Sequence, residues 1–479
     1  MGGEKWSMNF LEIKGLRVFY PSSPYSLKVD SLEVKEGESV LITGKSGSGK
    51  STLLNAVNGV IPHEIEAEEE GEVRVFGIDV RSTSIQNIAR YVGTLLQDPD
   101  SQILNYYVIE ELAFGAENLN LPREEILRRI NEVAQIVGVS HLLKRETFSL
   151  SGGEKQRVVL GSILVMNPKA LILDEPTSSI DLKGTREILT TLRGLKEKMS
   201  MIIAEHKISK VLDFVDRVIV LDRGRIIYDV KKDDVKEIDF EELGLEPLRP
   251  SPPPDKRREG EVVLEAEVRV TDGNRDIVNT QIKLRKGINA LIGDNGSGKS
   301  TLLKALAGIL PSNLKFYGSI KVEGKEVSKL PVEKRGEVIA YLPQEVDLMF
   351  TKRTVWEEVS FPAKVRGKYN EKVIDELLKR FNLPRDQDPF LLSVGQKRRV
   401  AISSLLATGV KVFLLDEPTT GQDWYNRKML GEELRSIDAC FLVVTHDPLF
   451  VYYYADRAYR MVDGRVTPIS PEDVIKWWL

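Results

Sequence analysis

The stretch GKSGSGKST, from Gly44 to Thr52, decides how the rest of the chain is interpreted. It fits the pattern G-x-x-x-x-G-K-[ST], in which glycines let backbone N–H groups curl around a phosphate. A strand-like apolar run precedes it at residues 40–42, and a helix-like stretch follows it at residues 53–57. Such a helix turns its positive N-terminus toward the same anion. The sequence therefore predicts a phosphate-binding loop between a strand and a helix.

The same stretch returns nearly intact as GDNGSGKST, from Gly293 to Thr301, again between an apolar run and a helix-like stretch. In each copy the lysine is expected to neutralise the β- and γ-phosphates, and the serine after it to offer a hydroxyl to Mg²⁺. Two such loops in comparable halves predict two bound nucleotides. The residues expected to contact nucleotide are Gly44, Lys45, Ser46, Gly47, Ser48, Gly49, Lys50, Ser51, Thr52, Gly293, Asp294, Asn295, Gly296, Ser297, Gly298, Lys299, Ser300 and Thr301, with Ser51 and Ser300 as metal ligands.

Length and composition indicate a globular protein of several domains. The 479 residues exceed one ordinary core, and 42% hydrophobic with 29% charged residues is typical of globular chains. The sequence contains no apolar run long enough to cross a bilayer and no N-terminal signal pattern. The single cysteine, Cys440, excludes an intramolecular disulfide framework and fits a reducing cytoplasm. A formal net charge of -4 gives no indication of general nucleic-acid binding.

The clearest boundary is the proline-rich stretch at residues 248–254, which a charged run follows at 255–259. Proline removes backbone donors and favours an extended spacer. We therefore expect one domain at residues 1–247, a linker at 248–260 and a second domain at 261–479. Both halves alternate strand-like apolar runs with helical patterns, which predicts α/β domains with a mainly parallel sheet.

Further motifs recur in the same order in both halves, which predicts a duplication. Each half has a glutamine after an apolar run, a Val-x-Glu-Glu segment with a later phenylalanine, a Leu-Ser-x-Gly stretch, an apolar run ending in Asp-Glu-Pro, and a histidine. In the first half these are Gln97, 108–114, 150–154, 171–176 and His206, and in the second half Gln344, 355–361, 392–396, 413–418 and His446.

This order of motifs resembles the ATP-binding cassette (ABC) ATPase family, and LSGGEKQR at residues 150–157 is its most specific feature. The resemblance covers nearly the whole chain, with one nucleotide-binding domain per half. It implies ATP and Mg²⁺ as cofactors. It also implies an α/β fold class of two tandem P-loop NTPase domains. Each domain would have a mainly parallel sheet core, an antiparallel β part and a helical subdomain that carries the signature motif.

The Asp-Glu pairs supply the candidate metal ligands and catalytic bases. Asp174 and Asp416 end apolar strands, where a carboxylate can hold Mg²⁺ or its bound water. Glu175 and Glu417 come next and resemble the family's catalytic glutamate, which orients or activates the attacking water.

The remaining polar candidates depend on their position in the motif order. The resemblance assigns Gln97 and Gln344 to both Mg²⁺ and the attacking water, and it assigns His206 and His446 to the γ-phosphate. A lone glutamine, or a lone histidine after a strand, would be uninformative without the motifs around it.

The resemblance also implies that each site is composite, because in the family the signature loop of one domain closes on the nucleotide held by the other. ATP would then hold the domains together, and the linker would make their pairing intramolecular. Asp181 and Asp423 fit the loop that crosses between domains. The first site would combine Lys50, Gln97, Glu175 and His206 with Ser393 and Gly395, and the second Lys299, Gln344, Glu417 and His446 with Ser151, Gly152 and Gly153.

Two departures from the family pattern distinguish the halves. Val394 replaces the first glycine of the second signature, which we expect to limit backbone approach to the phosphate. Tyr20 stands where the family stacks adenine, whereas residues 270–272 offer no aromatic side chain at the comparable place in the second half.

The string at residues 96–118 resembles the ATPase components of energy-coupling factor (ECF) importers, which take up vitamins and transition metals. Residues 392–399, LSVGQKRR, also resemble the fused two-domain ATPases of that group. The resemblance implies ATP hydrolysis coupled to import, with a transmembrane coupling subunit and a substrate-binding membrane subunit as partners. It places the chain peripherally at the cytoplasmic face of the cell membrane.

Two other readings stay open from the sequence. A tandem ABC protein acting on the ribosome usually has a long basic interdomain segment or a cysteine-rich domain, and this chain has a short linker and one cysteine. A sugar-importer ATPase is also tandem, but the QDPD string at residues 97–100 argues against it. The sequence does not name the solute.

Overall fold

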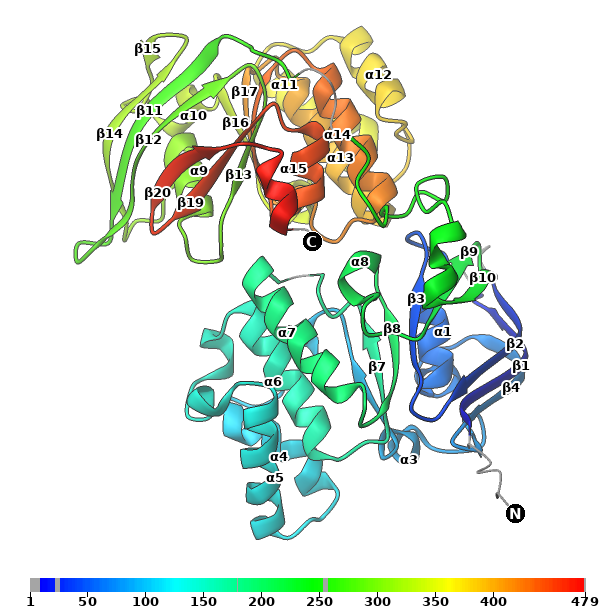
Figure 1. The fold of residues 1–479 in the computed structure, drawn as a ribbon. Coiled ribbons are helices and arrows are strands. Elements are labelled where there is room, and N and C mark those ends of the chain that lie inside the picture. The colour runs from blue at the N-terminus through cyan, green and yellow to red at the C-terminus, as the bar shows by residue number, and fades with distance from the viewer. Residues whose placement is uncertain (1–8, 22–25, 179, 253–256, 478–479) are drawn as a thin grey trace, which may run out of the picture. The chain divides into compact units, whose positions relative to one another are not determined.

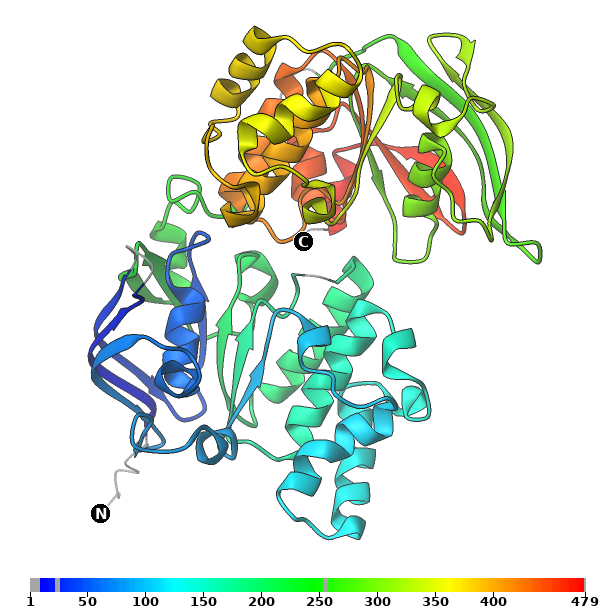
Figure 2. The same cartoon turned by 180° about the vertical axis from the view of Figure 1, so that it is seen from behind.

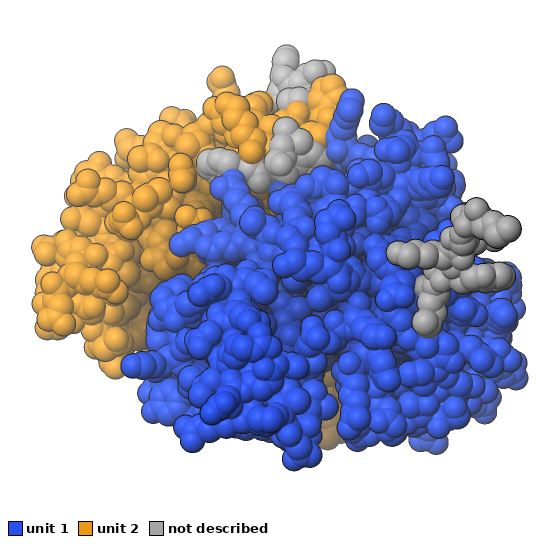
Figure 3. Space-filling model, turned by 60° about the horizontal axis from the view of Figure 1, so that its bottom comes forward, with its two compact units in different colours: residues 1–249 blue, residues 250–479 orange. Residues whose placement is uncertain are grey.

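The computed structural model describes residues 9–21, 26–178, 180–252 and 257–477. The chain divides into two compact units, residues 1–249 and 250–479, which are coloured separately in Figure 3. Residues 253–256 of the predicted linker lie outside the described part.

One continuous sheet supports the first unit, with the strand order β5-β4-β1-β2-β10-β9-β3-β8-β7-β6 (Figure 1). From β9 to β6 neighbouring strands pair in parallel, whereas β2, β1, β4 and β5 pair antiparallel. A parallel bridge between Arg225 of β10 and Lys28 of β2 joins the parallel and the antiparallel parts of the sheet. The strands are β1 (Asn9–Phe19), β2 (Ser26–Lys35), β3 (Ser39–Thr43), β4 (Glu68–Val75), β5 (Ile78–Asp79), β6 (Val92–Leu95), β7 (Ala170–Asp174), β8 (Ser200–Ala204), β9 (Arg217–Asp222) and β10 (Arg225–Lys231).

The parallel strands are mostly apolar because helices cover both of their faces. Successive side chains point to opposite faces, so Leu41 joins one core cluster while Val40 and Ile42 join another. The first cluster includes residues of α4 to α7, and the second includes residues of α1. The helices are α1 (Lys50–Val57), α2 (Val60–His63), α3 (Ile85–Ala89), α4 (Val108–Asn118), α5 (Arg123–Ile136), α6 (Gly152–Val165), α7 (Leu182–Leu195) and α8 (Ile208–Val211), with 3₁₀ turns at Pro99–Ser101, Ser140–Leu142, Thr147–Ser149 and Lys232–Glu237.

The second unit repeats this order in two sheets, β16-β17-β18-β13-β19-β20 and β12-β11-β14-β15. β16 to β19 pair in parallel, and the smaller sheet is antiparallel. The strands are β11 (Val262–Thr271), β12 (Asp276–Arg285), β13 (Gly287–Ile292), β14 (Lys315–Val322), β15 (Lys325–Glu326), β16 (Ile339–Leu342), β17 (Val412–Asp416), β18 (Cys440–Val444), β19 (Arg457–Val462) and β20 (Arg465–Ile469).

Helices cover the larger sheet of the second unit as they do in the first (Figure 2). They are α9 (Lys299–Ala307), α10 (Val332–Arg335), α11 (Val355–Val365), α12 (Glu371–Arg380), α13 (Val394–Leu406), α14 (Trp424–Ser436) and α15 (Pro448–Tyr454), with 3₁₀ turns at Val346–Met349, Pro389–Leu391 and Asp473–Trp477. The predicted fold class, with a parallel core, an antiparallel part and a signature-bearing helical part in each half, is confirmed. Within the described residues no helix has both the length and the apolar character needed to span a bilayer.

Candidate nucleotide-binding sites

The first phosphate loop leaves β3 at Thr43 and enters α1 at Lys50. Gly47 and Gly49 have φ values of 77° and 103°, in the left-handed region that favours glycine. The loop borders a cavity of about 320 Å³, whose lining includes Tyr20, Lys50, Ser51, Glu175 and His206. The structure thus gathers into one cavity residues that the sequence places far apart. The second loop runs likewise from β13 to α9.

Each loop lysine folds back over its own loop. The Lys50 Nζ donates to the carbonyl oxygens of Gly44 at 2.7 Å and Lys45 at 3.1 Å. The Lys299 Nζ donates to those of Gly293 at 2.7 Å and Asp294 at 2.9 Å. Both ammonium groups are therefore held where the loop's N–H groups would cradle a phosphate.

The loop serines lie beside the aspartates that end β7 and β17. The Ser51 Oγ is 3.3 Å from the Asp174 Oδ2, and the Ser300 Oγ is 3.3 Å from the Asp416 Oδ1. Burial raises the pKa of both carboxyls. A hydroxyl and a carboxylate at this spacing fit Mg²⁺, which takes a few protein oxygens and fills its shell with water and phosphate oxygens.

Each candidate catalytic glutamate lies against the histidine that the motif order pairs with it. The His206 Nε2 is 2.7 Å from the Glu175 Oε1, and the His446 Nε2 is 3.1 Å from the Glu417 Oε1. The His446 Nε2 also lies 3.1 Å from the Oδ1 of Asn295 in the second phosphate loop. In both units the structure brings together the glutamate and the histidine that the sequence assigns to the same site.

Both glutamates adopt a backbone conformation that the sequence did not reveal. Their φ values are 46° for Glu175 and 49° for Glu417, which are uncommon for residues other than glycine. Their backbone N–H groups donate to the carbonyl oxygens of Ala204 at 2.8 Å and Val444 at 2.9 Å, at the ends of β8 and β18. A left-handed turn thus redirects the chain between each aspartate and glutamate.

The two glutamates differ electrostatically. Burial alone would raise the pKa of Glu175, but the hydrogen bond and charge of His206 bring that pKa below its ordinary value. Glu417 is more deeply buried, and desolvation raises its pKa although Lys299 opposes the shift. The surroundings of the two carboxyls therefore shift their pKa values in opposite directions.

The predicted glutamines are exposed. Gln97 and Gln344 lie two residues after the ends of β6 and β16. A second glutamine, Gln102, holds the first of these segments: its Oε1 accepts from the Leu96 N–H at 2.7 Å and its amide donates to the Thr94 carbonyl at 2.9 Å. Sequence reasoning missed Gln102, although it closes the QDPDSQ string.

The signature serines are helix N-caps. The Ser151 Oγ accepts from the Glu154 N–H at 3.3 Å, and the glutamate accepts from the Ser151 N–H at 2.8 Å. Ser393 and Gln396 make the same exchange at 3.3 and 3.1 Å. These reciprocal capping boxes fix the N-termini of α6 and α13. Asp181 caps α7 likewise, through the Gly184 N–H at 2.8 Å.

The first and second glycine positions of the signature motif differ in how closely their surroundings are packed. A Cβ added at Gly153 would lie 3.0 Å from the Cα of Gly184, and one at Gly395 would lie 2.6 Å from the Oδ1 of Asn426. Val394, in contrast, keeps 52% of its surface exposed. Packing therefore restricts the second position, most firmly at Gly153, where the neighbouring atom belongs to the backbone, while the first position accommodates a side chain. Gly152 occupies that first position in α6.

Tyr20 lines the first cavity, and its hydroxyl lies 3.0 Å from the Oγ1 of Thr52. Its stacking on adenine stays a prediction. In the second unit, Thr271 ends β11, and its hydroxyl donates to the Arg275 carbonyl at 2.8 Å in the turn that follows.

Another feature that sequence reasoning missed is the role of the second glutamate in each Val-x-Glu-Glu segment. Glu111 is buried and accepts from the N–H groups of Leu104 at 3.0 Å and Asn105 at 2.8 Å. In the second unit, Glu358 accepts in the same way from the N–H groups of Thr351 at 2.8 Å and Lys352 at 2.7 Å. These carboxylates hold the loops before α4 and α11. The repetition of the Val-x-Glu-Glu segment was the sequence signal from which these two glutamates could have been identified.

Comparison with known proteins agrees with this geometry. The profile of the ABC transporter family matches residues 27–178 and 277–420. A relative from Sulfurisphaera tokodaii is 86% identical over 98% of this chain and 100% of its own length. A relative from Saccharolobus solfataricus is 48% identical over 98% of this chain and 95% of its own. Both carry the provisional name of an ABC transporter ATP-binding protein.

A solved complex that contains the archaeal ribosome recycling factor aABCE1 matches with a TM-score of 0.65. The match is 22% identical and covers 96% of this chain and 91% of that one, so it shows the shared fold alone. Both halves therefore match one family profile, and both build the same arrangement of loop lysine, aspartate, glutamate and histidine. The chain belongs to the ABC transporter family as an ATP-binding protein with two ABC ATPase domains.

Proposed function

We propose that this chain hydrolyses ATP at two composite sites and uses the cycle to drive import of a small solute, a vitamin or a transition metal, through separate membrane subunits of the ECF type. One observation carries the catalytic part. In each unit, a Glu–His pair and a Ser–Asp pair stand beside a phosphate loop whose lysine lies over the cradle.

Within each site, the residues would have separate roles. The loop lysine and N–H groups would bind the phosphates, and the histidine would contact the γ-phosphate. Mg²⁺, held by the serine and aspartate and joined by Gln97 or Gln344, would neutralise charge on the transferred phosphoryl group. Glu175 and Glu417 would orient the attacking water. The capped N-termini of α6 and α13 would complete the site of the opposite domain.

The proposal of membrane coupling rests on an exposed apolar surface in the first unit, which we call the α4 surface. Its residues are Leu104, Tyr106, Tyr107, Phe114 and Phe148, each exposed by 39% or more. The Tyr106 ring meets those of Tyr107 and Phe148 edge-on, with centroids 4.9 Å apart in both pairs. Tyr106 and Phe148 also line a cavity of about 320 Å³.

The second unit has a corresponding α11 surface, formed by Leu348, Phe361, Phe390 and Leu391. The Lys352 Nζ lies 3.7 Å from the centroid of the Phe361 ring. Exposed apolar surface of this kind marks interaction sites. The buried carboxylates of Glu111 and Glu358 hold the loops that border both surfaces. We assign both surfaces to short helices of the transmembrane coupling subunit, which an ABC ATPase needs in order to act on a membrane.

The test combines purification with uptake. The chain, expressed with the genes that neighbour it, should co-purify with membrane subunits and support ATP-dependent uptake in vesicles. Replacing Phe114 and Phe361 with alanine should break the complex or leave ATPase activity uncoupled from uptake. Tyr228 and Tyr317 are exposed aromatic residues on β10 and β14, and their replacement by alanine is the matched control. A stoichiometric complex with normal uptake in the Phe double variant would refute the assignment, and co-purification with ribosomes would refute transport itself.

A further inference from the structure

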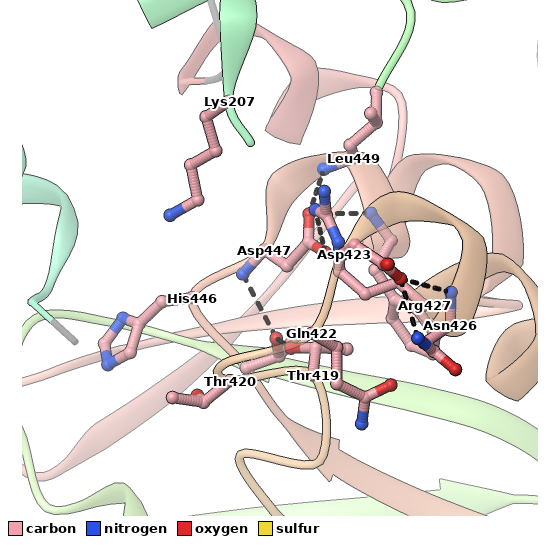
Figure 4. Close-up of polar contacts among 12 residues, drawn as sticks. Lys207, Thr419, Thr420, Gln422, Asp423, Asn426, Arg427, His446, Asp447 and Leu449 are labelled. Carbon is pink, nitrogen blue, oxygen red and sulfur yellow. Dashed lines mark hydrogen bonds and ion pairs between the residues drawn. The ribbon is translucent and has the colours of Figure 1, made fainter. Parts of the chain in front are cut away.

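The residue that follows His446 is engaged through both of its carboxylate oxygens. The Asp447 Oδ2 accepts from the Nη1 of Arg427 on α14 at 2.7 Å (Figure 4). Its Oδ1 accepts from the N–H groups of Leu449 and Phe450, both at 3.0 Å, and so caps α15. The ion pair is buried, since the Arg427 and Asp447 side chains are only 4% and 9% exposed.

The residue before His446 is held as well. The Thr445 Oγ1 lies 2.6 Å from the Oγ1 of Thr419, in the Asp-Glu-Pro-Thr segment, and accepts from the Asp447 N–H at 3.1 Å. The His446 N–H itself donates to the Glu417 Oε2 at 3.2 Å. The backbone of the second histidine loop is thus fixed on both sides of the ring that meets Glu417.

The first unit fixes its histidine loop in a different way. The buried carboxylate there is Glu205, which precedes the histidine instead of following it. It accepts from the hydroxyl of Thr177 at 2.6 Å and from the N–H groups of His206 at 2.9 Å and Lys207 at 3.2 Å. These bonds tie the loop to the Asp-Glu-Pro-Thr segment.

Counting from the aspartates that cap the two helices, the position of Arg427 on α14 corresponds to Thr185 on α7. The position of Asp447, directly after the histidine, corresponds to Lys207. A threonine and a lysine cannot form the ion pair. The tie between the histidine loop and the helix that begins at the capping aspartate therefore belongs to the second unit.

We propose that Arg427 is a positioning residue for the second site: through Asp447 it holds His446 in a fixed relation to α14. This inference rests on the proposed ATP hydrolysis, because positioning of the histidine matters only for that chemistry. The physical reason is the burial of the pair. Removal of one partner leaves a buried charge without compensation, and the loop must shift to hydrate it. Asp423 caps α14, and Arg427 lies one turn further along the same helix. A displacement of this helix would therefore move the Arg427–Asp447 ion pair and, through it, His446.

The first measurement follows the histidine rings directly. The full chain has four histidines, so carbon-13 labelling of histidine gives few signals, which His206→Gln and His446→Gln variants assign. Arg427→Met should shift the His446 signal and leave that of His206 in place. Thr185→Val, the matched change on α7, should move neither. A change at His206 equal to that at His446, or no change at His446, would overturn the proposal. This readout does not require turnover.

The second measurement is kinetic. With Glu175→Gln present, turnover reports the second site, and Arg427→Met should lower kcat by about tenfold with little change in KM. With Glu417→Gln present, the same variant should change kcat by less than about twofold. Arg427→Lys should restore part of the loss. Equal losses of kcat in both backgrounds would show that Arg427 has only a general structural role.

A combined variant covers the case in which Arg427→Met folds poorly. Arg427→Met with Asp447→Asn removes both charges and leaves no unpaired one, so it should fold, and it should still shift His446 and lower kcat. A fully active combined variant would refute the inference. Absence of ATPase activity from the unmodified chain would instead refute the proposed function, while the histidine signals would still decide the positioning role.

Discussion

Glu175 and Glu417 each turn in a left-handed conformation immediately after an aspartate and meet a histidine ring. Replacing both with glutamine preserves the size of the side chain and removes the basic oxygen. ATP binding should survive, while turnover should fall by at least ~10²-fold, the usual scale for a lost general base. Nucleotide binding and steady-state ATPase assays measure the two effects separately. Near-normal hydrolysis in the double variant would contradict the assigned role.

Glu433 on α14 gives a pH-dependent expectation. It is buried, its carboxylate oxygens have no hydrogen-bond partner within the described residues, and burial raises its pKa from 4.5 to about 7. The nearby Arg399 and Arg380 only partly oppose this shift. The folded chain therefore binds more protons than the unfolded chain between those two pH values. The free energy of unfolding should fall by up to about 3 kcal/mol as the pH rises through that window.

Glu433→Gln should remove this pH-dependent change in the free energy of unfolding. The variant should therefore be more stable than the parent chain at pH 8 and lose this advantage near pH 4.5. Guanidinium unfolding of the full chain, followed by tryptophan fluorescence, reports the second unit, because four of the five tryptophans lie after residue 260. Parallel pH profiles for the variant and the parent chain would show that Glu433 does not titrate as stated.

Sequence motifs pointed to the residues proposed to face the nucleotide but to few of those that hold them in place. Lys50, Asp174 and Glu175 belong to short patterns whose chemistry is local, and the duplication doubled the signal. Gln102 and Arg427 act through backbone groups or partners that folding brings near, Arg427 through a residue 20 positions away. Such partners have no fixed spacing, and the Arg427–Asp447 pair is confined to one half, so the repeat gave no help.

At the scale of the helix, the signature motifs show which glycine matters for packing. A Cβ at Gly153 would press within 3.0 Å of the Cα of Gly184, so α6 and α7 would have to separate. Gly153→Ala should therefore cost about 1–3 kcal/mol of stability. Gly152→Val, which copies the exposed Val394 of the second unit, should cost less than about 1 kcal/mol. Calorimetry of the full chain checks both. A Gly153→Ala protein as stable as its parent would mean that α6 and α7 are not in this close contact.

The strands themselves were easier to predict than their order. Buried parallel strands such as β3 and β18 are short apolar runs, and those runs were visible in the sequence. In the sheet, however, β3 lies between β8 and β9, which follow it by more than 150 residues. That neighbourhood depends on long-range packing, and local periodicity carries no trace of it. The antiparallel and helical parts were expected only through the family resemblance.

At the scale of the whole molecule, the duplicated units have diverged around a common chemical core. Both keep the lysine, the serine–aspartate pair and the glutamate–histidine pair. They differ in the aromatic residue beside the first cavity, in the first signature position and in the carboxylate that holds the histidine loop. These three differences affect groups that we propose to tune binding and positioning, so we expect chemistry to survive in both sites while their affinities differ.

The difference in nucleotide affinity is open to direct measurement. Tyr20 offers a ring beside the first loop, and stacking of a base on an aromatic ring is worth on the order of 1–3 kcal/mol in nucleic-acid binders. The second unit should therefore bind nucleotide about tenfold more weakly before the domains close, whereas Val394 should affect closure and not initial binding. Lys50→Ala leaves the second site competent, and Lys299→Ala leaves the first. Titration of a non-hydrolysable analogue should thus show tighter binding in Lys299→Ala, and Tyr20→Ala added to that variant should abolish the difference. Equal affinities in the two lysine variants, or tighter binding in Lys50→Ala, would show that the aromatic residue does not set the affinity of the first site.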